Sequence, residues 1–301
     1  MYHKIFIWLK AARLPSQSYI LLPILLGQMI AYSISNQFSW ELFYLLLAFS
    51  IFIQFFIIFA NDFADQETDS LNKTYTLFSG GSRVLVDGDL KATDLKRATI
   101  ILMTLCLGIG LVLNLFYHRH FSLFFVISSF LLLWAYSYKP IQLSYRGGGE
   151  LLQMLGLGFV LPLFSFYIQS DSFQGFPFSL LAVLFPTHLA CAIATSLPDQ
   201  PSDQISSKNS FTVKWGSGIA KTSILILQSI ASICLWIYYN SKSSIYFNEF
   251  LYFVPLFGIL FTVFFFKSQP GNTRLSLFVF FSLFTTMTIE AGLILIYYVL
   301  S

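Results

Sequence analysis

Long apolar stretches alternate with short polar segments along the whole 301-residue chain. A helix needs about 20 mostly apolar residues to cross the hydrocarbon core of a bilayer. Nine stretches approach or reach that length, at roughly 15–35, 40–60, 97–117, 121–138, 151–169, 178–197, 218–239, 249–266 and 275–299. The pattern predicts an all-α fold, a polytopic membrane bundle of about nine transmembrane helices that forms a single domain over residues 1–301.

Basic residues are distributed unevenly over the segments between these stretches. If the N-terminus is cytoplasmic, the cytoplasmic segments and their immediate flanks hold all of the 17 Lys and Arg residues except Arg119 and Lys242. Cytoplasmic loops of membrane proteins carry an excess of Lys and Arg. The distribution therefore predicts nine crossings, a cytoplasmic N-terminus and a cap of loops on the cytoplasmic side.

Composition agrees with a membrane location. Only 10% of the residues are charged and 56% are hydrophobic, whereas a soluble domain has roughly 25% charged residues. The net charge of +3 does not indicate nucleic acid as a partner. The three cysteines lie within apolar runs and share no disulfide or metal-site spacing, so they are expected to be small core residues.

Four acidic side chains follow the second apolar stretch directly. The segment is Asn61-Asp-Phe-Ala-Asp-Gln-Glu-Thr-Asp69, in which Asn61, Asp65 and Asp69 are spaced i, i+4 and i+8. If the helix continues through it, these three lie along one face with Asp62 beside them. Like charges at this spacing repel each other, so this face is expected to attract cations.

The same spacing recurs after the sixth apolar stretch, at Asp199 and Asp203. Each group of four spans has an acidic segment after its second helix, and both segments fall on the predicted cytoplasmic side. Residues 15–138 and 151–266 are therefore expected to form a weak parallel repeat, followed by an additional final helix at 275–299.

The polar residues suit a magnesium diphosphate. Carboxylate and amide oxygens are the ligands that Mg²⁺ prefers, and Mg²⁺ commonly bridges protein to phosphate oxygens. The same loops carry Lys and Arg for anionic oxygens and glycines that allow close backbone approach, and the spans beneath them are rich in Phe and Tyr. This combination fits an isoprenyl diphosphate held above an apolar chamber. The basic loop residues are Lys73, Arg83, Lys139, Arg146 and Lys208.

The two acidic segments, Asn61-Asp-x-x-Asp-x-x-x-Asp69 and Asp199-x-x-x-Asp203, resemble the aspartate-rich motifs of the UbiA superfamily of intramembrane aromatic prenyltransferases. The resemblance covers nearly the whole chain and includes Arg13-Leu-Pro15, Ser-Gly-Gly-Ser-Arg83 and Tyr136-Ser-x-x-Pro140. Two departures bear on the local helix geometry and on one phosphate contact. Pro201 stands where the family often has an acid, and Ser207-Lys-Asn-Ser-Phe211 replaces Gly-Lys-Arg-Thr-Leu.

This resemblance implies magnesium-dependent transfer of an isoprenyl group from an isoprenyl diphosphate to an aromatic acceptor within the lipid bilayer. The segments Tyr145 to Glu150 and Tyr167-Ile-Gln-Ser170 are more similar to the 1,4-dihydroxy-2-naphthoate branch of menaquinone biosynthesis than to the 4-hydroxybenzoate branch. The resemblance further implies a bacterial inner-membrane protein whose active site faces the cytoplasm.

Residue roles follow from the same resemblance. Asp65, Asp69, Asp199 and Asp203 would be the catalytic residues, and together with Asn61 and Asp62 they would hold Mg²⁺. The diphosphate would be bound by Asn61, Arg83, Lys139, Arg146 and Lys208. The allylic cation then attacks an aromatic carbon, and loss of a proton, or of the carboxylate in the naphthoate case, restores aromaticity.

Other readings of the pattern lead to other functions. 4-Hydroxybenzoate, or another aromatic or lipid acceptor, is the alternative within the superfamily. A secondary transporter would place acids near the bilayer midplane in broken helices, and here only Glu290 is central, where it is expected to face the bundle interior. A phosphatidyl-alcohol transferase would need an Asp-Gly…Ala-Arg…Gly…Asp pattern, which Asp87-Gly88 does not continue. His188 and Glu150 have both structural and functional interpretations.

Overall fold

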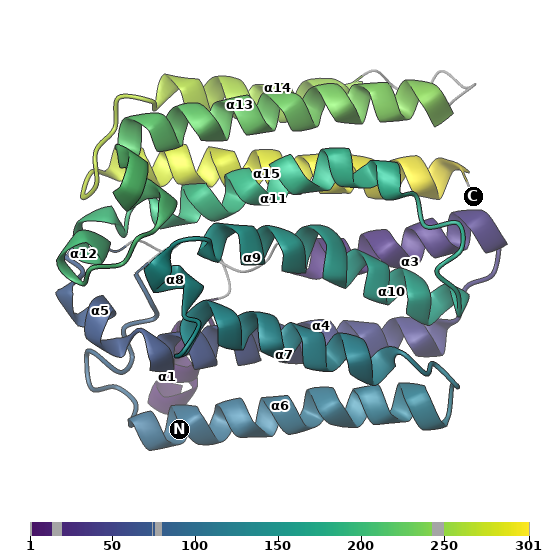
Figure 1. Cartoon of the computed structure of the whole chain (residues 1–301), viewed down its shortest axis with the longest axis horizontal. Coiled ribbons are helices and arrows are strands. Elements are labelled where there is room, and N and C mark those ends of the chain that lie inside the picture. The colour runs from purple at the N-terminus through teal and green to yellow at the C-terminus, as the bar shows by residue number, and fades with distance from the viewer. Residues whose placement is uncertain (1, 14–19, 74, 76–79, 243–249, 301) are drawn as a thin grey trace.

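The computed structural model describes residues 2–13, 20–73, 75, 80–242 and 250–300, and it contains only helices and connecting segments over these residues (Figure 1). Six helices of this part of the chain are long and apolar enough to cross a bilayer. They are α4 (Trp40–Ala64), α6 (Ala92–Leu115), the continuous segment α9 (Gly149–Leu155), η2 (Gly156–Val160) and α10 (Leu161–Ser170), the segment η3 (Phe178–Leu180) and α11 (Leu181–Ser196), α13 (Phe211–Lys242) and α15 (Thr273–Leu300).

Three further apolar helices are shorter: α3 (Leu21–Ser35), α7 (Ser122–Ser137) and α14 (Phe250–Phe264). Together the long and short helices coincide with the predicted stretches. A helix of 15 or 16 residues rises only about 22–24 Å, less than the ~30 Å thickness of a typical hydrocarbon core. Membrane crossing is therefore supported by length for six helices, and the count of nine stays a prediction.

Polar segments that were expected to be loops contain short helices. These are α5 (Gln66–Leu71), α8 (Leu143–Arg146) and α12 (Gln200–Ile205), and they gather at one end of the bundle, on the left of Figure 1. Helices α5 and α12 contact each other although about 130 residues separate them in sequence. This end of the bundle thus brings the two acidic segments together.

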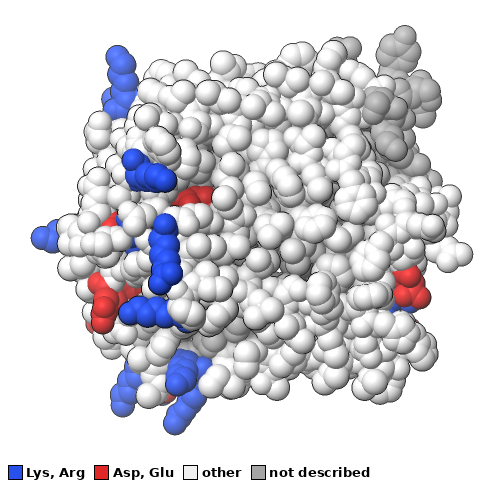
Figure 2. Space-filling model, in the orientation of Figure 1, with Lys and Arg blue, Asp and Glu red and all other residues white. Residues whose placement is uncertain are grey.

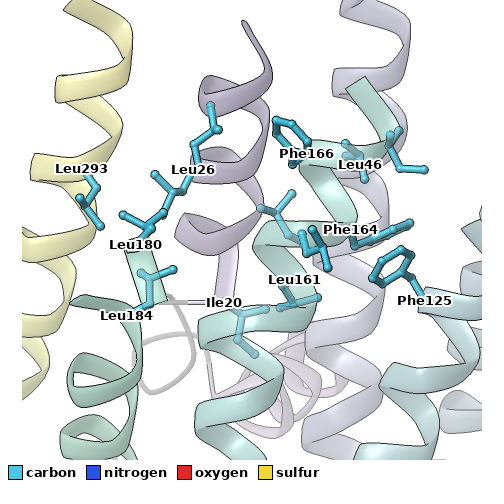
Figure 3. Packing of buried hydrophobic residues seen from close by; sticks show 14 of the residues in the cluster. Ile20, Leu26, Leu46, Phe125, Leu161, Phe164, Phe166, Leu180, Leu184 and Leu293 are labelled. Carbon is cyan, nitrogen blue, oxygen red and sulfur yellow. The ribbon is translucent and has the colours of Figure 1, made fainter. Parts of the chain in front are cut away.

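The apolar core is built mainly from aliphatic side chains, with aromatic rings packed among them (Figure 3). Phe164 of α10 is fully buried, and its ring centroid lies 5.1 Å from that of Phe49 and 5.3 Å from that of Phe125. Helix α3 packs closely on α10, because a Cβ at Gly27 would lie only 2.1 Å from the carbonyl oxygen of Pro162. Lipid tails are as apolar as these side chains, so van der Waals packing stabilises this core more than exclusion of water does.

Charged side chains gather at the end of the bundle that carries α5, α8 and α12. Figure 2 shows Lys and Arg there, interspersed with Asp and Glu, whereas most of the remaining visible surface is uncharged. The first helix, α1 (Tyr2–Ala12), packs near this end, where Trp8 meets Phe59 at a ring-centroid distance of 5.7 Å. The side of the membrane that this end faces stays a prediction.

Candidate active site

The first acidic segment continues the axis of α4 with one irregular residue. Helix α4 ends at Ala64, Asp65 has φ −99° and ψ 8°, and α5 begins at Gln66. The backbone N–H of Asp65 nevertheless donates to the Asn61 carbonyl, and that of Asp69 donates to the Asp65 carbonyl, both at 2.9 Å. The i, i+4 alignment is thus retained, and all three side chains line one polar cavity.

The second acidic segment lines the same cavity. Asp199 precedes α12 and Asp203 lies within it, and the N–H of Asp203 donates to the Asp199 carbonyl at 2.9 Å. Pro201 falls in the first turn of this helix, where a missing N–H breaks no helical hydrogen bond. The departure at Pro201 therefore leaves the geometry of the Asp199–Asp203 pair unchanged.

Lys208 connects the two acidic segments. Its Nζ lies 2.9 Å from Oδ2 of Asp65 and 3.9 Å from Oδ1 of Asp203, and 4.8 Å above the ring centroid of Tyr145. The Tyr145 hydroxyl donates to Oδ1 of Asp65 at 3.0 Å. Burial alone would lower the pKa of Lys208, but the neighbouring carboxylates outweigh it and hold the pKa above its usual value. Lys208 is thus a buried cation shared by both motifs.

The carboxylates outnumber the cations inside the cavity. Burial, followed by the charges of Asp65, Asp62 and Asp199, raises the pKa of Asp69 to about 8. Burial also raises the pKa of Asp203 to about 7, although Lys208 and a 3.0 Å hydrogen bond from the Ser210 hydroxyl oppose the shift. Such crowded, desolvated carboxylates favour a cationic ligand.

Asp199 is held by an amide. Nδ2 of Asn72 donates to Oδ1 of Asp199 at 2.8 Å, which links the segment after α5 to the residue before α12. Burial raises the pKa of Asp199, while Lys208, Arg13 and this hydrogen bond act in the opposite direction. The two acidic segments are thus joined through Asn72 as well as through Lys208.

The glycine segment 80–81 closes one wall of the cavity. Gly81 has φ 68°, and a Cβ at this position would lie 1.9 Å from Oδ2 of Asp69. Asp62 positions this segment: its Oδ2 accepts from the backbone N–H of Ser82 at 3.0 Å, and its Oδ1 lies 3.5 Å from Nη1 of Arg13. Asp62 therefore lies beside the cavity, and a direct role for it in metal binding stays a prediction.

The predicted basic residues differ in position. Arg83 donates from Nη1 to the carbonyl oxygens of Asp69 and Asn72, each at 3.1 Å, so it fixes the end of α5 and is not part of the cavity lining. Lys139 and Arg146 are exposed and do not line the cavity. Of the predicted diphosphate-binding cations in the described chain, Lys208 alone lines the cavity in this structure.

Several lining residues had no signal in the sequence that marked them as part of a site. Their contribution follows from tertiary packing, which brings α8, α9 and α11 to the cavity; they include Ser144, Gln153, Thr195 and Ser196. Tyr136 of α7, which belongs to a motif of the sequence resemblance, also lines the cavity. Glu150 also lines the cavity, and its Oε1 accepts the backbone N–H of Phe211 at 2.6 Å, so this carboxylate fixes the start of α13.

Glu290 faces the bundle interior, as predicted. It and His188 are fully buried, and Oε1 of Glu290 lies 3.0 Å from Nε2 of His188, without the angular geometry of a hydrogen bond. Neither residue lines the polar cavity or the adjoining apolar cavity described below. The pair therefore connects α11 to α15 at a distance from the candidate site.

An apolar cavity adjoins the polar one. It is lined by aliphatic side chains of α4, α7 and the α9–η2–α10 segment, and it shares four lining residues with the polar cavity. The shared residues are Arg13, Asn61, Tyr136 and Gln153. A ligand with a polar head and an apolar tail would fit across this junction.

The donor set fits Mg²⁺ bound together with a phosphate ligand. Within the described residues, no three His, Cys, Asp or Glu side chains converge on one point as an all-protein metal site requires. Mg²⁺ usually takes only one or two carboxylates and completes its shell with water and phosphate oxygens. Two i, i+4 carboxylate pairs that line one cavity, Asp65 with Asp69 and Asp199 with Asp203, meet that requirement.

The fold and site define a class of protein: an integral-membrane helical enzyme with paired acidic motifs at one end of its bundle. Residues 20–284 match the sequence model of the UbiA prenyltransferase family, and the chain belongs to this family. No curated protein sequence matches the chain significantly.

Solved structures share the fold at low sequence identity. A UbiA homolog from Archaeoglobus fulgidus bound to DMAPP and Mg²⁺ has a TM-score of 0.63 at 16% identity, over 94% of this chain and 99% of that one. A UbiA homolog from Aeropyrum pernix K1 without ligand has a TM-score of 0.67 at 14% identity, over 93% and 98%. A digeranylgeranylglyceryl phosphate synthase gives 0.63 at 18% identity, over 98% of each chain.

Proposed function

We propose that this chain transfers an isoprenyl group from an isoprenyl diphosphate to an aromatic acceptor, with Mg²⁺ as cofactor. The observation that carries the proposal is the meeting of both acidic motifs and Lys208 around a polar cavity that adjoins an apolar one. Diphosphate and hydrocarbon are the two parts of the donor, and each cavity suits one of them. The homolog from Archaeoglobus fulgidus, which has the same fold, binds DMAPP or GPP together with Mg²⁺.

Acidic residues would bind Mg²⁺, and basic residues would bind the diphosphate. Asn61, Asp65, Asp69, Asp199 and Asp203 would hold Mg²⁺, with Asp62 behind them; bound Mg²⁺ neutralises charge on diphosphate oxygens. The Lys208 ammonium exchanges its carboxylate partners for the leaving diphosphate, which stabilises the charge that develops there. In the loaded enzyme Arg83, Lys139 and Arg146 add positive charge around the site. Gly80 and Gly81 let phosphate oxygens approach the backbone.

The transfer consumes only the isoprenyl diphosphate and the aromatic acceptor. The bond between C1 of the isoprenyl group and the bridging oxygen breaks, and its electron pair leaves with the diphosphate. C1 then forms a bond to an aromatic carbon, which releases a proton or, in a ring carboxylated at that carbon, carbon dioxide. The aliphatic walls of the apolar cavity exclude water, which would otherwise capture the allylic cation.

The proposed acceptor is 1,4-dihydroxy-2-naphthoate, as in menaquinone biosynthesis. Its support is the resemblance of Tyr145 to Glu150 to that branch of the superfamily. We further propose nine crossings, with the N-terminus and the charged end of the bundle facing the cytoplasm of a bacterial inner membrane. The location of 15 of the 17 Lys and Arg residues on one predicted side supports this orientation.

A direct test uses detergent-purified protein with Mg²⁺, a panel of isoprenyl diphosphates, and either 1,4-dihydroxy-2-naphthoate or 4-hydroxybenzoate, with the product detected by mass. Asp203→Asn should lose at least about 100-fold in turnover, the scale of one lost electrostatic contact to a transition state. Asp94→Asn is the control, since the Asp94 side chain is 43% exposed at the start of α6 and lines neither cavity. Full activity in Asp203→Asn, or activity indifferent to chelator, would overturn the proposal. A product from 4-hydroxybenzoate alone would overturn only the acceptor.

A further inference from the structure

Three uncharged polar side chains, Asn61, Tyr136 and Gln153, lie at the junction of the two cavities. Of the four residues that line both cavities, Asn61 accepts a hydrogen bond from the Ser137 hydroxyl at 2.9 Å, and Arg13 lies 3.5 Å from Asp62. The side-chain amide of Gln153 and the hydroxyl of Tyr136 form no hydrogen bond within the described part of the chain. These two side chains can therefore form hydrogen bonds with a ligand at the junction.

The surroundings hold both groups in place. Helix α9 begins at Gly149, and the neighbouring Glu150 is anchored through the Phe211 N–H, so Gln153 lies one turn into an anchored helix. The Tyr136 ring packs against Gly149, where a Cβ would lie 2.9 Å from Cε2 of the ring. Both side chains are half-buried and line the cavities, so each can form hydrogen bonds with a ligand that enters the junction.

The position of the isoprenyl diphosphate determines where the acceptor ring must bind. With diphosphate in the polar cavity and the isoprenyl tail in the apolar cavity, the C1–oxygen bond lies between them. The acceptor ring must therefore lie at the junction when the new bond forms. A neutral amide both donates and accepts hydrogen bonds, and a phenolic hydroxyl is the complementary group. The carboxylate of an acceptor would instead seek a cation.

We propose that Gln153, assisted by Tyr136, binds the hydroxyl group of the aromatic acceptor and so selects hydroxylated rings. This inference rests on the proposed prenyl transfer. It assigns Gln153 to acceptor recognition and leaves binding of the diphosphate to the acidic segments and Lys208. The consequence is a separation of effects: a change at Gln153 alters the KM for the acceptor and leaves the KM for the isoprenyl diphosphate unchanged.

Gln153→Met tests the inference, because methionine has a similar size and cannot form the hydrogen bonds. Wild type and variant are compared on an acceptor and its methyl ether, using whichever of 1,4-dihydroxy-2-naphthoate and 4-hydroxybenzoate wild type prenylates. We expect wild type to prefer the free hydroxyl by at least about tenfold, the effect of one good hydrogen bond. Gln153→Met should lose most of that preference, with an unchanged KM for the donor.

The matched control is Leu151→Met, since Leu151 is exposed on the same helix and lines neither cavity. It should retain the wild-type preference for the hydroxyl. Tyr136→Phe, which keeps the ring against Gly149, should show a smaller loss of preference than Gln153→Met. A full wild-type preference in Gln153→Met, or a donor KM that rises as much as the acceptor KM, would overturn this inference alone. Prenylation of neither acceptor by wild type would overturn the proposed function as well.

Discussion

Replacing Lys208 by methionine removes the cation that both acidic segments share. The Lys208 side chain is 11% exposed and its partner Asp65 is 7% exposed, so the pair is largely shielded from solvent. Methionine fills a similar volume, and the substitution therefore isolates the charge from the packing. In the variant, no ammonium group lies between the carboxylates of Asp65 and Asp203.

The expected loss follows from the two distances. At an effective dielectric constant of about 20, attraction between unit charges is about 6 kcal/mol at 2.9 Å and about 4 kcal/mol at 3.9 Å. Desolvation of the ions offsets most of this gross attraction. Removing one partner of a buried ion pair typically costs 3–5 kcal/mol. A loss of about 3 kcal/mol lowers the Tm of a chain of this size by roughly 5 °C.

The assay is thermal unfolding of the detergent-purified protein in EDTA and in Mg²⁺. In EDTA, Lys208→Met should melt roughly 5 °C below wild type. Because a divalent cation can replace the missing positive charge, Mg²⁺ should raise the Tm of the variant more than that of wild type. Turnover should still fall, since the leaving diphosphate loses its ammonium contact.

The control is Lys214→Met, the same substitution at an exposed lysine six residues further on, whose ammonium lies 5.4 Å above the Trp215 ring. Its Tm should stay within about 1 °C of wild type in both conditions, as for most exposed substitutions. The reasoning is refuted if the Tm of Lys208→Met in EDTA equals that of wild type, or if Mg²⁺ raises the Tm of both proteins equally.

Two further predictions concern the glycine segment and the pH dependence. Gly81→Ala should lose most activity, because its Cβ would lie 1.9 Å from Oδ2 of Asp69. Gly88→Ala, with a similar φ of 74° but no atom within 4 Å, should change only the Tm; equal losses of product formation in the two variants would contradict this. In EDTA, stability should fall as the pH rises from about 4 to 8. The pKa values of Asp69 and Asp203, about 8 and about 7, exceed the usual 3.8, so the folded chain binds more protons than the unfolded one in that window. Asp69→Asn should show a shallower fall of Tm over pH 4 to 8, and an unchanged slope would count against the assigned pKa of Asp69.

Hydrophobicity alone located the helices, because a bilayer demands long apolar segments whatever their neighbours are. The spacing of Asn61, Asp65 and Asp69 likewise predicted a shared face, since that relation is local to one helix. Helix α5 agrees with the continuation of the helix that was considered for this segment, whereas α12 was not predicted, because six residues of polar sequence carry no apolar periodicity.

Features that depend on tertiary packing could not be predicted from the sequence. Lys208 and Arg146 both lie in basic loop segments, yet one is buried against Asp65 and the other is exposed. Asp62 differs from Asp65 only in its direction around the helix, and that direction turns it toward the Ser82 backbone. Gln153 appeared to be an ordinary member of an apolar span, and only the meeting of α7 and α9 brings it to the junction.

The π-helical turn Gly156–Val160 has a consequence for how one membrane segment serves two environments. A π turn carries an additional residue, so the helix after it is rotated by about 100° relative to an uninterrupted α-helix. Gln153, before the turn, reaches the polar cavity, while Leu161, after it, lines the apolar cavity, and Phe164 enters the aromatic core. A single inserted residue thus sets the angular offset between Gln153 at the junction of the cavities and Phe164 in the core. Deleting it would restore a regular helix and remove either Gln153 from the junction or Phe164 from the core.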